Sequence, residues 1–316
     1  MKNNLYPMRL TRFTFPYILS LILFTVACTS TKGQINTATS QDSPPVKHVE
    51  VYEIYPDDEK GFLVEKRFYN ENGQLTRFHA YDFYGSGEIE DSVSYSYNEK
   101  GQKIEQFTSG SQTTTTYAYN EQGKLKEESW SRPNGQGAKS IYSYNSSGDV
   151  VEIKYYDADG KHDYSRVYEL GYDRKGRMIS EKKWEKYTDG SADLLQYHYE
   201  FEYNSDDSVL VRERLDAEGN VDRKVEYEYD KAGRLISEVE TALSKGKEKQ
   251  KEKTVYHLNE LGQVIKDESI SIFDGKERLN YTNSYKYDEY GHCIWSMYKH
   301  AEENDARGER SVYTYY

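Results

Sequence analysis

A five-residue pattern, Tyr-(Asn/Asp)-x-x-Gly or a close variant, recurs along most of this 316-residue chain and constrains its fold more than any other feature. Its glycines are Gly73, Gly101, Gly123, Gly148, Gly176, Gly233, Gly262 and Gly291, and a ninth copy has Asp207 in place of glycine. Consecutive copies are 22 to 31 residues apart. Such regular spacing is typical of a repeat protein.

Each copy of the pattern predicts a β-hairpin. The Asn or Asp side chain caps its own turn, and the glycine accepts a positive φ, as in a type I turn followed by a bulge. A Tyr-x-Tyr pair such as Tyr227 and Tyr229 precedes the turn, and an apolar residue such as Leu235 follows it. Because residues two apart in a strand share a face, the tyrosines and the apolar residue are expected on one side of the sheet.

A second set of turns, such as "DADG" at 157–160 and "DAEG" at 216–219, lies between the first. Each repeat of about 27 residues is therefore two strands, and the chain predicts an all-β antiparallel meander of about 20 strands. Open twisted sheets rarely exceed ~10 strands without curling. We therefore expect a curled or spiral sheet, with a flat single-layer sheet as the alternative.

The amino-acid composition supports strands and argues against one class of partner, nucleic acid. The chain contains 33 Tyr but only 10 Phe and 3 Trp, and tyrosine is enriched in strands. Its net charge of −12 argues against a nucleic-acid partner, since phosphate binding needs clustered Lys and Arg.

The N-terminus predicts export and anchoring. Residues 1–27 combine Lys2, Arg9 and Arg12 with an apolar run from 13 to 27, as in a signal peptide. The run is short for a transmembrane helix, which needs ~20 apolar residues. "FTVA" followed by Cys28 resembles a bacterial lipobox, which implies lipidation at Cys28; ordinary secretion with another cleavage point is the alternative. Residues 28–46 form a polar tether and 47–316 the repeat domain. By the same resemblance, the absence of Asp directly after Cys28 favours the outer membrane.

The repeat itself resembles a known family. The stretch Tyr229–Leu235 ("YDKAGRL"), and nearly so Tyr172–Met178 ("YDRKGRM"), is similar to the YD repeat of Rhs and teneurin-type proteins. The resemblance covers most of residues 51–316. It implies an extended β-repeat surface, in a family whose sheets spiral into hollow shells and are often described as sugar-binding.

Three tryptophans are the candidate ligand-binding residues. Trp130, Trp184 and Trp295 each follow a turn of the first set by four to eight residues, so they are expected in the same zone of the sheet. Exposed aromatic rings can stack on sugars or anchor a protein partner. The alternative is that they fill a thin core.

Other candidates for chemistry have structural explanations. "DADGKHD" (Asp157, Asp159, Asp163) looks like part of a calcium loop, but the distal Glu position is Val167, and the similar turn "DAEG" at 216–219 favours an Asx-Gly turn. Cys293 stands where other repeats have Leu or Val, which favours a buried small residue. The His residues lack metal-site spacing. We therefore expect no metal, no cofactor and no enzymatic activity.

The sequence thus predicts a non-enzymatic bacterial envelope lipoprotein whose β-repeat surface binds a carbohydrate or protein partner. The first alternative is a structural or accessory shell component of an Rhs-like system. The second, a glycan-directed hydrolase, would require convergent acids that the sequence does not place.

The anchor is testable. Two or three acyl chains on Cys28 give stable membrane attachment, whereas one chain is marginal. Cys28→Ser should move the protein from the detergent phase to the soluble fraction in a detergent partition assay. Unchanged partitioning would rule out lipidation at this residue.

Overall fold

The computed structural model describes residues 44–82, 87–302 and 306–316. The predicted signal peptide (1–27), Cys28 and the tether as far as residue 43 lie outside these residues. In the part of the chain that is described, no helix is long and apolar enough to cross a membrane, a finding that does not bear on strands.

The described chain forms 20 β-strands joined in a meander. Their bounds are β1 (Val46–Tyr55), β2 (Asp58–Tyr69), β3 (Leu75–Tyr81), β4 (Ile89–Tyr97), β5 (Lys103–Thr108), β6 (Thr113–Tyr119), β7 (Leu125–Ser131), β8 (Gly137–Tyr144), β9 (Val150–Asp157), β10 (His162–Tyr172), β11 (Met178–Tyr187), β12 (Leu194–Tyr203), β13 (Val209–Leu215), β14 (Val221–Tyr229), β15 (Leu235–Ser244), β16 (Lys247–Leu258), β17 (Val264–Phe273), β18 (Lys276–Tyr287), β19 (Cys293–His300) and β20 (Ala306–Tyr315). Each strand pairs antiparallel with the next along the chain, as β14 does with β15.

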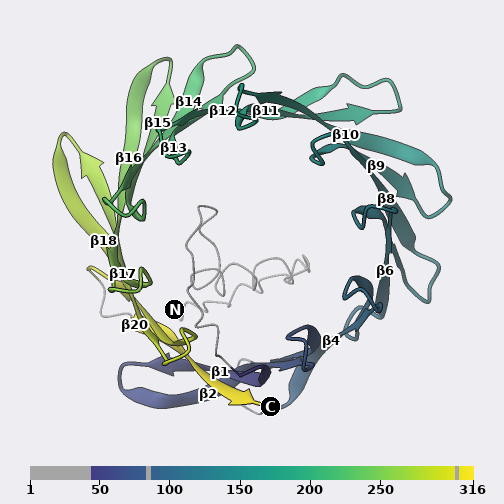
Figure 1. Ribbon diagram of the computed structural model, residues 1–316, viewed down its shortest axis with the longest axis horizontal. Coiled ribbons are helices and arrows are strands. Elements are labelled where there is room, and N and C mark those ends of the chain that lie inside the picture. Colours follow the sequence, from purple (N-terminus) through teal and green to yellow (C-terminus); the bar gives the residue numbers. More distant parts are fainter. Residues whose placement is uncertain (1–43, 83–86, 303–305) are drawn as a thin grey trace, which may run out of the picture. The chain divides into compact units, whose positions relative to one another are not determined.

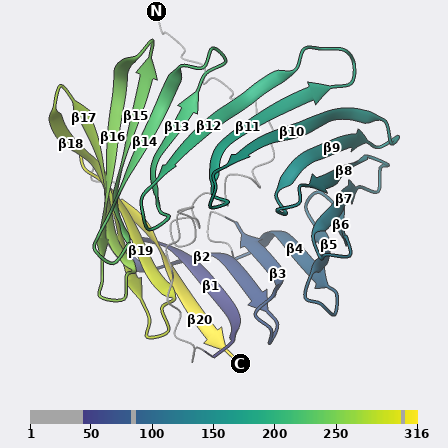
Figure 2. The same ribbon diagram turned by 45° about the horizontal axis from the view of Figure 1, so that its top comes forward.

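The sheet closes into a barrel, because β20 also pairs antiparallel with β1 (Figure 1). Val49 lies opposite Tyr313, and Tyr52 lies opposite Arg310. The strands cross the wall at a slant (Figure 2), as barrel closure requires. For 20 strands spaced by ~4.8 Å, this geometry gives a barrel roughly 40 Å across.

The predicted curled or spiral open sheet is therefore wrong, and so is the flat single-layer alternative. An open sheet exposes two edges with unpaired N–H and C=O groups, and full closure removes both. The final "SVYTYY" segment provides the strand that pairs with β1. The repeat period gives the number of strands but not whether the first and the last strand meet.

The turns of the first set have the conformation that their residues favour. At Asp230–Gly233, Oδ1 of Asp230 accepts the backbone N–H groups of Ala232 and Arg234, each at 2.9 Å. Gly233 has φ +77°, and Asp207 in the degenerate copy has φ +64°. The remaining glycines of the pattern also have positive φ: Gly73, Gly101, Gly123, Gly148, Gly176, Gly262 and Gly291.

Neighbouring repeats are joined by a recurring hydrogen bond, here called the tyrosine latch. The second tyrosine of Tyr-x-Tyr donates its hydroxyl to the backbone carbonyl two residues past the turn of the preceding repeat. Tyr229, for example, donates to the carbonyl of Val209 at 2.8 Å. Distances are 2.6 to 2.8 Å in six latches: Tyr97–Leu75, Tyr119–Lys103, Tyr144–Leu125, Tyr203–Met178, Tyr229–Val209 and Tyr287–Val264.

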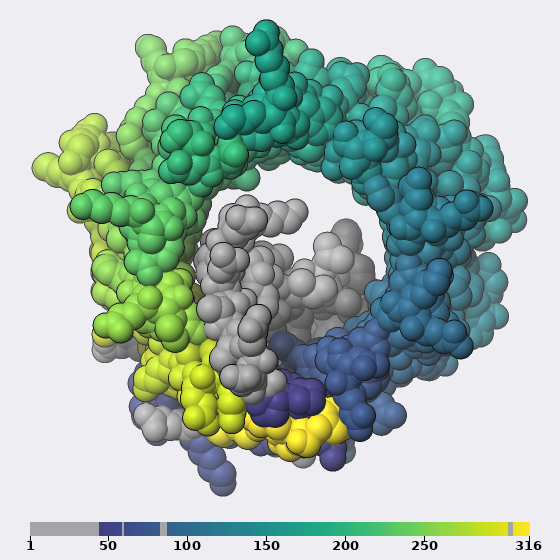
Figure 3. Space-filling model, viewed as in Figure 1, coloured from purple at the N-terminus to yellow at the C-terminus, as the bar shows by residue number. Residues whose placement is uncertain are grey.

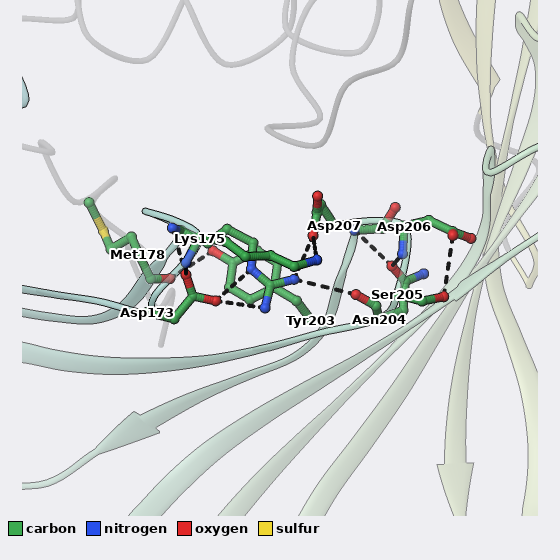
Figure 4. Close-up of polar contacts among 10 residues, drawn as sticks. Asp173, Lys175, Met178, Tyr203, Asn204, Ser205, Asp206 and Asp207 are labelled. Carbon is green, nitrogen blue, oxygen red and sulfur yellow. Dashed lines mark hydrogen bonds and ion pairs between the residues drawn. The ribbon is translucent and has the colours of Figure 1, made fainter.

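The latch tyrosines mark the face of the sheet that lines the barrel interior. The turns of the first set lie inside the ring in Figure 1, whereas the hairpins at the other end flare outward. In Figure 4, Tyr203 lies on the same side of the sheet as these turns, and the guanidinium of Arg177 is 4.7 Å from its ring centroid. We call this side the tyrosine face and the other side the opposite face. The tyrosine face surrounds an open centre (Figure 3).

An acidic cluster lies on the tyrosine face where the barrel closes. Glu65 of β2 is only 6% exposed and accepts a hydrogen bond from Arg67. Glu309 of β20 lies opposite Glu53 of β1. Burial raises the pKa of Glu309 to about 6, and the negative charge of Glu65 adds to the increase while Arg67 opposes it. Glu53, Glu65 and Glu309 therefore share this face with the guanidinium of Arg67.

The turn glycines can be tested at Gly233, where an added Cβ would meet no atom within 4 Å. Gly233→Val should lower the free energy of unfolding by about 1–3 kcal/mol through backbone strain alone. Lys231→Ala, in the same turn, should be nearly silent. Denaturant unfolding of both variants measures the difference, and equal effects would contradict the role assigned to the glycine.

The closing cluster predicts a pH dependence. Because the pKa of Glu309 is raised from 4.5 to about 6, its contribution to stability is complete below pH ~4.5 and is lost as the pH rises through 6. Glu309→Gln should therefore reduce the fall in unfolding free energy between pH ~4.5 and ~6.5 by about 1–2 kcal/mol. Urea unfolding at both pH values tests this, with the exposed Glu226→Gln as the control. If the unfolding free energy of Glu309→Gln fell as much as that of the wild type over this pH range, the Glu309 carboxyl would not be the cause of the pH dependence.

Candidate functional site

The three predicted tryptophans do not converge. Trp130 lies on β7 between Thr115 and Ala138, on the tyrosine face. Trp184 of β11 lies opposite Val167 and Leu195, on the opposite face, and its buried indole nitrogen has no hydrogen-bond partner among the described residues. Trp295 also lies on the opposite face, on β19. The expected common zone is therefore absent, and Trp130 is the tryptophan that lines the interior.

Trp130 shares its face of the sheet with polar and aromatic side chains of the neighbouring strands. Its cross-strand neighbours, Thr115 and Ala138, are both smaller than the indole. The guanidinium of Arg132 lies 5.4 Å from the centroid of the Trp130 ring. We define the Trp130 patch as residues Lys103, Gln106, Tyr117, Glu128, Trp130 and Tyr142, from β5 to β8.

Hydrogen bonds hold the other side chains of the Trp130 patch in place. Tyr142 donates its hydroxyl to Glu128 at 3.0 Å, and Tyr117 donates to the Gln106 side chain at 3.4 Å. The Lys103 ammonium lies 4.2 Å from the Tyr117 ring centroid and 3.3 Å from Oε1 of Gln106. The patch therefore combines a flat aromatic ring with fixed donors and acceptors.

Burial changes the titration of these groups. Burial and, secondarily, the charge of Glu128 raise the pKa of Tyr117 to about 12. The pKa of Tyr142 is also raised by burial and by Glu128, and burial lowers the pKa of Lys103. Both tyrosines therefore remain protonated at neutral pH and act as hydrogen-bond donors.

The tyrosine–carboxylate unit of the patch recurs around the barrel. Its other copies are Tyr197 with Glu181 at 2.7 Å, Tyr256 with Glu238 at 3.2 Å and Tyr285 with Asp267 at 2.7 Å. Burial raises the pKa of Glu238 and of Asp267. Since the unit recurs, it belongs to the wall, and Trp130 is what distinguishes the patch.

Sequence reasoning missed one position of the repeat, the seventh residue after the turn glycine. Its side chain lies on the interior wall, and its residue type differs from repeat to repeat. All its copies lie on the tyrosine face: Ala80, Thr108, Trp130, Tyr155, Lys183, Arg214, Glu240, Ser269 and Tyr298. The latch position is nearly constant by comparison. The spacing from the turn glycine was the signal that could have identified this variable position.

The remaining candidates have structural contacts. Oδ1 of Asp157 accepts the backbone N–H groups of Asp159 and Lys161 at 3.1 and 2.8 Å, as in a turn. The half-buried Cys293 thiol lies 3.5 Å from the carbonyl of Trp295. Over residues 44–82, 87–302 and 306–316, no group of three or more His, Cys, Asp or Glu side chains could hold a metal ion.

Comparisons with known proteins give distant structural similarity. No protein-family model matches the chain, and no curated protein does. The crystal structure of TcdB2-TccC3-TEV is similar over 78% of this chain at 14% identity and a TM-score of 0.34, but the chain spans only 15% of its length. A porin-like protein from Bacteroides uniformis ATCC 8492 is similar over 85% of this chain and 98% of its own, at 12% identity and a TM-score of 0.37. One from Bacteroides vulgatus ATCC 8482 is similar over 86% and 99%, at 9% identity and a TM-score of 0.30.

Proposed function

We propose that this protein is a non-enzymatic, lipid-anchored envelope protein whose barrel binds an oligosaccharide on the tyrosine face. The observation that carries the proposal is the Trp130 patch, where an indole ring and hydrogen-bonded polar side chains lie on the same interior face of neighbouring strands. The YD-type repeat is the scaffold that positions it.

Carbohydrate fits this combination of side chains. The apolar C–H face of a sugar ring packs on a flat aromatic ring, and its hydroxyls need both donors and acceptors. Glu128 and Gln106 supply acceptors, and Lys103 supplies a donor. Because hydrogen bonds already fix Glu128 and Gln106, little side-chain entropy is lost when a ligand binds.

The barrel wall itself favours a position outside the lipid. On the opposite face of β14, Lys224, Glu226 and Glu228 follow one another at alternate positions. A membrane-spanning barrel needs an apolar outer band, and Lys at the bilayer midplane costs ~2–4 kcal/mol. The proposed attachment is therefore through acylated Cys28 and the polar tether, as the N-terminal sequence predicts.

A structural or accessory shell component is less well supported. Such a role needs a free sheet edge to which further repeats can be added. In the described barrel, the pairing of β1 with β20 occupies both terminal strands.

The proposal predicts different effects at two tryptophans. In isothermal titration calorimetry against a panel of envelope oligosaccharides, at least one sugar should bind the wild-type protein. Trp130→Ala should weaken that binding at least ten-fold by removing the stacking ring. Trp184→Ala, on the opposite face, should lower the melting temperature but leave the affinity unchanged.

Two results would contradict the proposal. The first is that no oligosaccharide in the panel binds. The second is that both tryptophan variants weaken binding equally, which would mean that the loss comes from general destabilisation of the barrel.

A further inference from the structure

The opposite face carries a concentration of cations and aromatic rings where the barrel closes. It consists of three cross-strand ladders, which together we call the seam patch. Their members are Lys286–Trp295–Arg310–Tyr52, Glu50–Lys66–His79 and His48–Phe68–Arg77. The ladders cross β18, β19, β20, β1, β2 and β3, which are neighbours in the ring (Figure 1).

Cations and rings alternate in the seam patch and contact one another. The Lys286 ammonium lies 4.4 Å from the Trp295 ring centroid, and the Arg310 guanidinium lies 4.3 Å from that of Tyr52. Lys66 and Arg77 lie 5.4 and 5.9 Å from the ring of Phe68. These contacts hold the long side chains against the wall.

The seam patch is basic although the chain as a whole is acidic. Its ladders contain Lys66, Arg77, Lys286 and Arg310 and a single acid, Glu50, whose carboxylate is paired with Lys66 at 2.7 Å. The chain has a net charge of −12. Positive charge concentrated on one face of an acidic protein points to an anionic partner.

The other side of the ring has the reverse charge. Strands β12–β14 lie across the ring from β1, β2 and β20 (Figure 1). On their opposite face they carry five glutamates: Glu200, Glu202, Glu213, Glu226 and Glu228. An anionic surface would therefore attract the seam patch and repel the far side, which gives the barrel one preferred orientation.

The place where the tether joins the barrel, at Val46, indicates which anionic surface is nearest. β1 begins at Val46 and contributes His48, Glu50 and Tyr52 to the seam patch. Seventeen residues lie between Cys28 and Val46, and this stretch spans at most about 60 Å when extended. A lipid on Cys28 would keep the seam patch within this distance of a membrane.

We propose that the seam patch docks the barrel on an anionic, phosphate-bearing lipid surface. Cations attract the phosphate headgroups, and Trp and Tyr side chains favour the level of the headgroups. The proposal rests on the proposed membrane anchor for its setting, but the docking itself does not need the acyl chains.

Vesicle flotation of residues 29–316 tests the docking, because this chain keeps the whole barrel and lacks Cys28. It should float with vesicles of phosphatidylcholine and phosphatidylglycerol but not with phosphatidylcholine alone, and added salt should release it. The triple variant Lys66→Gln, Arg77→Gln, Lys286→Gln should bind at least ten-fold more weakly.

A matched triple variant controls for charge. Lys154→Gln, Lys182→Gln, Lys224→Gln removes the same charge from the opposite face of β9, β11 and β14 and should bind phosphatidylglycerol vesicles like the wild type. Equal loss in both triple variants would overturn the proposal, since it would reflect net charge alone. So would no binding to anionic vesicles, or displacement by millimolar inorganic phosphate, which would indicate a site for the free anion.

The outcome is separable from that of the proposed function. Failure of the vesicle assay leaves the oligosaccharide titration and the Cys28→Ser partition assay unaffected. Loss of partitioning in Cys28→Ser, together with vesicle binding of residues 29–316, would show that the anchor and the seam patch act as two independent contacts.

Discussion

The tyrosine latch is the interaction on which the rest of the barrel depends. Each strand is paired by backbone hydrogen bonds with the next one along the chain, both within a hairpin and between hairpins. By reaching the carbonyl two residues past the preceding turn, Tyr229 and its equivalents add a side-chain hydrogen bond between neighbouring strands at the end where the first set of turns lies. A hydroxyl–carbonyl bond contributes only about 0.5–1.5 kcal/mol. Its effect comes from repetition, because six such bonds recur around the barrel.

The latch also separates conserved geometry from variable chemistry along each strand. Positions next to the turn are mostly occupied by the latch tyrosine and an apolar residue, with Leu258 and Lys103 as exceptions, so they differ little between repeats. Further from the turn the wall carries Trp130 in one repeat, Lys183 in another and Ser269 in a third. The interior can thus present different side chains at one height without disturbing the contacts that close the ring.

The sequence predicted what is local and missed what depends on the whole ring. The Asn or Asp cap and the following glycine define each turn by themselves, and Gly233 and Asp207 both have the positive φ that this turn requires. Closure could not be predicted, because it depends on the sum of many small rotations and on the pairing of Val49 with Tyr313, which are far apart in the chain. The tryptophans were different, because the signal was present in the sequence. Trp130 lies seven residues past its turn glycine, whereas Trp184 and Trp295 lie eight and four residues past theirs, and an even spacing places the side chain on the opposite face.

Closure gives the two faces different surroundings, and their compositions differ accordingly. The tyrosine face is concave and crowded, so its carboxylates are held by tyrosine hydroxyls, and burial raises the pKa of Asp267. The opposite face is convex, and its charges are free to sort into a basic region around Lys66 and an acidic region around Glu226. The proposed oligosaccharide inside the ring would contact hydrogen-bonded side chains, whereas the proposed lipid surface outside it would meet a basic and an acidic region on different sides of the barrel. One repeat can serve both proposals, because alternate residues of each strand lie on different sides of a closed sheet.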